Sequence, residues 1–164
     1  MTKKFIVLME YSDGKKYGSF RKEEQLRKTQ IIFSELGDKK TLDAGCGTGI
    51  SSSLFSDIIG VDPSTELLKE NPYPHIRGKA ENLPFKDNEF ENVICITAIH
   101  NFDDIDKGLE EIKRVGTNFG FSVMKKSAKF KEIKTKIKKL FKIKKEIDEG
   151  IDEIFICEKE QTTI

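Results

Sequence analysis

The segment that most constrains the fold is residues 42–49, which read Leu-Asp-Ala-Gly-Cys-Gly-Thr-Gly. A short apolar run leads straight into glycines at every second position, and a helical pattern follows. Glycine permits a tight turn and lets a ligand touch the backbone, while the first N–H groups of a helix offer hydrogen-bond donors. The segment therefore predicts a strand, a ligand-binding turn and a helix in succession.

The chain beyond residue 40 continues this alternation of apolar runs and helical patterns, which is typical of a parallel α/β sheet. The expected strands are residues 41–44, 58–61, 75–78, 93–97 and 119–124. The expected helices are residues 20–36, 50–56, 65–70, 104–115 and 130–140. Two further strands, around residues 141–147 and 153–158, are expected to pair as an antiparallel hairpin. We expect an α/β fold with a Rossmann-like doubly wound sheet, mostly parallel, with an antiparallel C-terminal hairpin strand.

A length of 164 residues predicts a single domain. Within it we expect an N-terminal helical or lid segment, residues 1–40, and a core, residues 41–164. The longest apolar stretches, residues 5–9 and 93–96, are far shorter than a membrane span or a signal-peptide core. We therefore expect a cytoplasmic protein with no membrane partner.

The three cysteines, Cys46, Cys95 and Cys157, are widely spaced and form no C-x-x-C pair. This spacing suggests neither a disulfide framework nor a metal site.

The net charge of +1 excludes a strong field over the whole chain, but lysines are concentrated in one stretch. Residues 125–145 contain 11 lysines and a single acid, Glu132. They could contact RNA phosphates, or they could form the solvated face of the helix expected at residues 130–140. We favour the solvated face.

Two acids near the glycines indicate what the turn binds. Asp43 lies two residues before Gly45, where its carboxylate would repel a pyrophosphate and suit an ammonium group. Asp62 ends the next apolar run, at the place where an acid accepts hydrogen bonds from ribose hydroxyls in doubly wound folds. Together they predict a nucleoside with a positively charged tail and no phosphate, which fits S-adenosylmethionine.

With these residues in place, the sequence resembles the class I S-adenosylmethionine-dependent methyltransferases, in the small quinone-biosynthesis-type and type 11-like group. The resemblance covers roughly residues 40–160 and rests on six segments in the right order: residues 42–49, 61–64, 78–85, 87–94, 98–102 and 109–115. It implies a methyltransferase that uses S-adenosylmethionine and releases S-adenosylhomocysteine.

The resemblance also implies eight cofactor-binding positions: Asp43, Gly45, Cys46, Gly47, Asp62, Ala80, Glu81 and Thr97. Asp43 would face the methionine amino end and Asp62 would hold the ribose. The turn residues at 45–47 would pass their backbone along the cofactor. Ala80 and Glu81 would lie beside the adenine, and Thr97 would border the methionine portion.

One departure from the family pattern concerns the adenine. Lys79 stands where the family commonly has an aspartate that accepts from the adenine amino group. Either Glu81 takes over this role or cofactor binding is weaker.

The resemblance assigns no catalytic residue. Methyl transfer is an in-line displacement, so orientation of the reactants can do most of the work. His100, just after the fourth expected strand, is a candidate general base because the pKa of a free imidazole lies near 6.5. We favour the alternative that it caps the next helix or packs on the cofactor.

The methyl acceptor is not identified by the sequence. The chain has no room for an insertion after the fifth strand, which slightly favours a large acceptor such as RNA or protein, or a partner subunit that completes the site. The alternatives are a small-molecule acceptor with residues 1–40 as a lid, and a non-catalytic cofactor-binding subunit.

Overall fold

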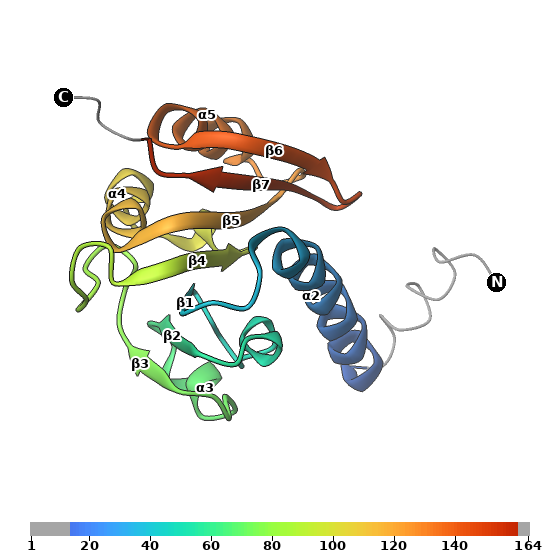
Figure 1. Cartoon of the computed structure of the whole chain (residues 1–164). Coiled ribbons are helices and arrows are strands. Elements are labelled where there is room, and N and C mark those ends of the chain that lie inside the picture. The colour runs from blue at the N-terminus through green and yellow to red at the C-terminus, as the bar shows by residue number, and fades with distance from the viewer. Residues whose placement is uncertain (1–13, 161–164) are drawn as a thin grey trace.

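The computed structural model describes residues 14–160 and contains a seven-stranded sheet in the order β3-β2-β1-β4-β5-β7-β6 (Figure 1). The strands are β1 (Thr41–Ala44), β2 (Ile58–Asp62), β3 (His75–Arg77), β4 (Phe90–Ile96), β5 (Gly116–Met124), β6 (Lys142–Asp148) and β7 (Asp152–Glu158). The helices are α2 (Gly14–Leu36), α3 (Thr65–Leu68), α4 (Ile105–Val115) and α5 (Phe130–Leu140), with short 3-10 turns η1 (Ser51–Leu54) and η2 (Ile99–Asn101).

Strands β1 to β5 run parallel, and the C-terminal hairpin completes the sheet. β7 pairs antiparallel with β5, and β6 pairs antiparallel with β7 at the edge. This topology confirms the expected doubly wound, mostly parallel sheet with an antiparallel hairpin. All five parallel strands end at the same edge of the sheet, so the loops that follow them lie together.

The sheet is covered on both faces because successive side chains of its central strands point to opposite sides. Val93 and Cys95 of β4 pack in the core that α4 and α5 cover. Ile94 and Ile96 pack in a second core with α2. Figure 1 shows α2 apart from α4 and α5, with the sheet between them.

Two predicted helices are shorter in the structure. The helix predicted at 50–56 is only the 3-10 turn η1, because the hydroxyls of Ser51 and Ser52 bind the buried Asp43 carboxylate instead of solvent. α3 ends at Leu68, and Pro72 soon follows. The first helix is longer than predicted, since α2 begins at Gly14 and ends before Gly37, as expected.

Within residues 14–160, no helix has both the length and the apolar character needed to cross a membrane. Residues 1–13 of the expected lid lie outside the described residues.

Candidate cofactor site

A pocket of about 420 Å³ lies where β1, β2, β3 and β4 end. It is lined by Gly45, by residues 61–64 and 78–81, and by Ala98 with residues 101–103. Leu67 and Phe102 give it an apolar side, while the Asp62 carboxylate gives it a polar one.

The glycine-rich turn after β1 lines this pocket through Gly45. Gly45 has a φ of +79°, and a Cβ at this position would lie 2.6 Å from the Cβ of Ala98. The backbone N–H groups of Gly45 and Cys46 both donate to the Val61 carbonyl, at 2.7 and 3.1 Å. The turn is therefore fixed to β2, and position 45 requires glycine both for its positive φ and for the close approach of Ala98.

Asp62 lies in the pocket wall and organises two turns. Its Oδ2 accepts from the backbone N–H of Gly47 at 3.0 Å, and its Oδ1 accepts from that of Ser64 at 2.8 Å. Each carboxylate oxygen has a second lone pair, so the side chain can still accept hydrogen bonds from a ligand's hydroxyl groups.

Asp43 is fully buried on β1 and is not one of the described residues that line the pocket. Its Oδ2 accepts from the hydroxyls of Ser51 and Ser52 at 2.6 and 2.8 Å. Its Oδ1 has no hydrogen-bond partner among the described residues. Burial raises the pKa of this carboxyl to about 6, although the two serine hydroxyls oppose the shift. Strand β1 thus holds, two residues before the glycine turn, a buried carboxyl oxygen without a hydrogen-bond partner among the described residues.

Cys46 points its side chain away from this pocket, into the protein. The Asn71 side-chain amide donates to Cys46 Sγ at 3.5 Å and to the Gly47 carbonyl at 3.1 Å. Burial, followed by the charges of Asp43 and Asp62, raises the thiol's pKa far above its usual value. The thiol stays protonated, so only the main chain of Cys46 is available to a ligand.

The predicted adenine side contains Ala80 and Glu81, which both line the pocket. Glu81 Oε2 accepts from the backbone N–H groups of Asp103 and Asp104, at 2.8 and 3.1 Å, and so fixes the loop before α4. Lys79 forms an exposed ion pair with Asp103 Oδ2 at 2.6 Å. That ion pair lowers the pKa of Asp103.

Sequence reasoning missed Asp103, although it lines the pocket. The sequence gives only the acid pair at 103–104, and such a pair indicates the start of a helix, not a ligand site.

Thr97 and His100 do not line the pocket, judged from the described residues. The Thr97 hydroxyl binds Asp152 at 2.7 Å in a separate polar cluster, while the next residue, Ala98, faces the pocket. The backbone carbonyl of His100 accepts from Lys129 Nζ at 3.2 Å, and burial lowers the pKa of its imidazole.

These features define a doubly wound domain that binds a nucleoside cofactor: the sheet topology, the glycine turn after β1 and the acid at the end of β2. The profile of the methyltransferase domain family matches residues 42–124. The chain belongs to this family, and its cofactor is S-adenosylmethionine.

Relatives extend the match over more of the chain. An uncharacterised protein of Methanocaldococcus jannaschii, MJ1252, is 31% identical over 144 residues, which is 82% of this chain and 57% of that protein. The chain spans about half the length of the curated relatives it matches.

Solved structures share the fold over nearly the whole chain. A Thermotoga maritima protein described as a possible histamine N-methyltransferase superposes with a TM-score of 0.72 and 18% identity, covering 95% of this chain and 99% of that one. A methyltransferase in complex with the Haloferax volcanii Trm112 activator gives a TM-score of 0.73 and 13% identity, covering 92% and 96%. At these identities the likeness shows the fold alone.

The residues at the pocket fit the cofactor. Asp62 offers carboxylate oxygens to ribose hydroxyls, and the side chains of Leu67, Ala80 and Phe102 offer apolar surface to a base. Gly45 lines the pocket without a side chain, so a ligand can approach its backbone, and the buried Asp43 carboxyl lies two residues before this turn.

Proposed function

We propose that the protein transfers the methyl group of S-adenosylmethionine to a small-molecule acceptor. The observation that carries the transfer itself is the pocket at the carboxyl ends of four parallel strands, with the Gly45 turn and Asp62 in its wall. When bound, the cofactor supplies a methyl group activated by a positively charged sulfur.

In this proposal the chain contributes binding and orientation. Asp62 would hold the ribose, the backbone at 45–47 would lie along the cofactor, and Asp43 would balance the charge of the methionine amino end. Ala80 and Glu81 would lie beside the adenine, and Thr97 would act near the methionine portion through its backbone. Orientation of this kind lowers a barrier by about 7–11 kcal/mol, so no dedicated base is required.

A second cavity supports the small-molecule acceptor. It has a volume of about 420 Å³ and is lined by Lys22 and Leu26 of α2, by Thr48 and Gly49 of the glycine turn, and by Tyr73 among others. Because α2 supplies one wall, the cavity supports the proposed role of residues 1–40 as a lid over the core at 41–164.

A macromolecular acceptor, which the sequence slightly favoured, keeps one supporting observation. Among the described residues, none after Asp103 lines the cofactor pocket, so no segment between Asp104 and residue 160 covers it. Against this, the Thermotoga maritima protein of matching extent is described as a possible methyltransferase of histamine, a small amine. A domain of this size therefore does not by itself require a large acceptor.

A partner subunit is also part of the proposal, because one structural neighbour was solved in complex with a methyltransferase activator. Such a subunit would complete the site where the described chain leaves it open.

Two measurements test these proposals. Calorimetry should show binding of S-adenosylmethionine and S-adenosylhomocysteine in preference to NAD, and tighter binding of NAD would overturn the cofactor assignment. Labelled S-adenosylmethionine incubated with fractionated cell extract should then place label in small molecules. Label in RNA or protein would replace the acceptor class, whereas cofactor binding without transfer to any fraction would favour a non-catalytic subunit.

A further inference from the structure

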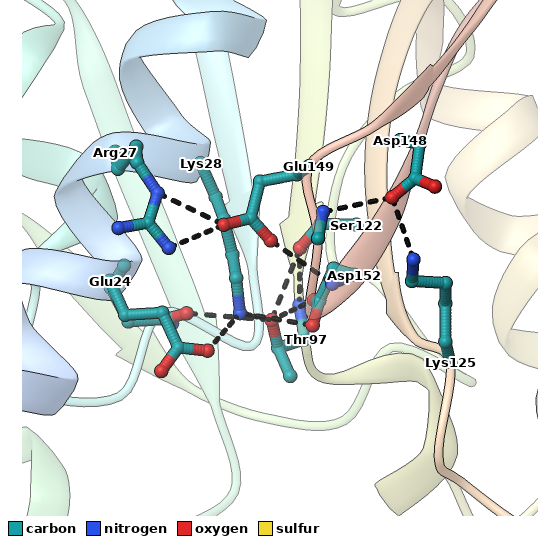
Figure 2. Close-up of polar contacts among 11 residues, drawn as sticks. Glu24, Arg27, Lys28, Thr97, Ser122, Lys125, Asp148, Glu149 and Asp152 are labelled. Carbon is teal, nitrogen blue, oxygen red and sulfur yellow. Dashed lines mark hydrogen bonds and ion pairs between the residues drawn. The ribbon is translucent and has the colours of Figure 1, made fainter. Parts of the chain in front are cut away.

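A buried ion pair joins two parts of the chain that are far apart in sequence. Lys28 of α2 is 1% exposed and Asp152 at the start of β7 is 0% exposed. Lys28 Nζ lies 3.0 Å from Asp152 Oδ1 and 2.6 Å from Glu24 Oε1 (Figure 2). Removing such charges from water costs free energy that the pairing often fails to recover, so stability is a weak explanation for this cluster.

The cluster converges on Thr97, the residue that follows β4. Asp152 Oδ2 accepts a hydrogen bond from Thr97 Oγ1 at 2.7 Å. Lys28 Nζ donates to Thr97 Oγ1 at 3.3 Å. The backbone N–H of Thr97 donates to the Ser122 carbonyl and lies 3.0 Å from Ser122 Oγ. Figure 2 shows these side chains pointing toward one another from α2, the end of β4, β5 and β7.

Thr97 has an unusual backbone conformation. Its φ is +52°, in the left-handed region that a β-branched residue adopts only when its surroundings impose it. The chain turns at this residue, and the next one, Ala98, lines the pocket and lies directly beside Gly45. The contacts of the Thr97 side chain therefore hold the backbone that shapes the cofactor pocket.

We infer that Asp152 and Lys28 are positioning residues for the cofactor site. They hold Thr97 in the left-handed conformation and thereby fix Ala98 and the turn η2 against the glycine-rich segment. Through Lys28 and Glu24, the position of α2 is coupled to the pocket wall. The inference rests on cofactor binding in this pocket and adds residues that do not themselves touch it.

The direct test is calorimetric binding of S-adenosylhomocysteine to Asp152→Asn, which keeps the shape of the side chain and removes its charge. The strain of one non-glycine residue in the left-handed region corresponds to about a tenfold change in the equilibrium between that conformation and its alternatives. The affinity for S-adenosylhomocysteine should therefore fall by about tenfold. The matched control is Asp148→Asn, which removes an exposed carboxylate paired with Lys125 at 2.7 Å. This control should bind within about twofold of the wild type.

A second pair of variants isolates the backbone effect. Thr97→Ala and Thr97→Gly both remove the hydroxyl, but only glycine adopts a positive φ without strain. Thr97→Ala should lose about tenfold in affinity, whereas Thr97→Gly should stay within about threefold of the wild type. In the Thr97→Gly background, Asp152→Asn should cost less than about twofold, because the conformation no longer needs support.

Several results would overturn the inference. They are a folded Asp152→Asn that binds as tightly as the wild type, an equal loss in Thr97→Ala and Thr97→Gly, and an equal effect of Asp152→Asn in both backgrounds. If Asp152→Asn does not fold, the comparison of affinity between Thr97→Ala and Thr97→Gly tests the inference by itself. A wild-type protein that fails to bind S-adenosylhomocysteine would instead contradict the cofactor assignment itself.

Discussion

Asp62 both shapes the glycine turn and faces the pocket, so one substitution affects both. In Asp62→Ala the backbone N–H groups of Gly47 and Ser64 lose their acceptors. We expect S-adenosylmethionine binding to weaken by about 1.5–3 kcal/mol, as is usual when a charged hydrogen-bond acceptor is lost, while the protein still folds. Calorimetry should show this loss.

Asp57→Ala is the matched control for that experiment. Asp57 is exposed just before β2, and its contact with Thr41 uses the backbone carbonyl. Unchanged binding in Asp62→Ala would show that the ribose lies elsewhere.

Asp43 makes stability depend on pH. Burial is the largest cause of the rise in its pKa from 3.8 to about 6, so between these values the folded protein holds a proton that the unfolded chain has lost. This contribution to stability is fully present below pH 3.8 and is lost as the pH rises through 6. Relative to Asp43→Asn, the wild type should therefore lose up to about 3 kcal/mol between pH 4 and 7.

Urea unfolding of both proteins across that pH range measures the difference and cancels the contributions of other groups. A constant difference between the two proteins would contradict the assignment of the raised pKa to Asp43. If the cofactor's ammonium group lies near Asp43, a saturating concentration of S-adenosylmethionine should reduce the pH dependence, because a nearby positive charge favours the ionised carboxylate.

A site residue could be predicted from the sequence when its position depends only on neighbouring residues in the chain. The positions of Gly45 and Asp62 in the pocket wall could be predicted because each depends on one strand and the turn after it. The engagement of Glu81 by the loop before α4, and the backbone conformation of Thr97, depend on segments distant in sequence. The spacing of residues in the sequence does not predict such contacts.

The glycine turn can be tested against a second glycine of nearly identical conformation. Gly45 and Gly37 have φ values of +79° and +80°, but a Cβ on Gly37 would meet its nearest atom only at 3.9 Å. Both alanine substitutions should cost about 1–2 kcal/mol of stability from backbone strain. Only Gly45→Ala adds a clash with Ala98, so it alone should abolish binding of S-adenosylhomocysteine.

Thermal unfolding and calorimetry on the two variants separate these effects. Equal loss of binding in Gly37→Ala, which lies at the end of α2, would show that the strain matters and the pocket wall does not.

At the level of elements, the strong patterns were predictable and the short ones were not. The spacing of Ile105, Leu109 and Ile112 gave α4 to within one residue at its start, because this face packs fully on the sheet. The hairpin was also placed correctly. The helix predicted at 50–56 was wrong because its serines bind the buried Asp43 carboxylate, which the periodicity of the apolar residues does not show.

Across the whole molecule, the lysine-rich stretch is largely neutralised by acids from other elements. Six of its lysines pair with acids outside the stretch: Lys125 with Asp148, Lys134 with Glu153, Lys136 with Asp106, Lys138 with Glu146, Lys142 with Glu158 and Lys145 with Glu35. The sequence shows the lysines but not these partners, since the fold brings the acids to them. Lys142 moreover lies on β6, so it does not continue the face of α5.

These pairs lead to a prediction about nucleic acid. Replacing Lys134, Lys138 and Lys142 together by glutamine should leave the affinity for single-stranded RNA and its salt dependence unchanged, because the lysines already face acids. Stability should fall slightly, since ion pairs at the surface contribute about 0–1 kcal/mol each. The control triple, Lys126, Lys131 and Lys139 to glutamine, removes the same charge from exposed lysines to which the described structure gives no ion pair, and it should melt closer to the wild type.

Titration of both variants with polyuridine at several salt concentrations gives the answer. If the stretch did bind RNA, each lost phosphate contact would lower the slope of log affinity against log salt by about 0.7 for a single strand. A clear drop in RNA affinity with unchanged melting would then make the lysines a binding surface and restore RNA as the acceptor. A drop limited to the control triple would place that surface on the unpaired lysines, because a lysine already held by an acid releases fewer counterions when it meets a phosphate.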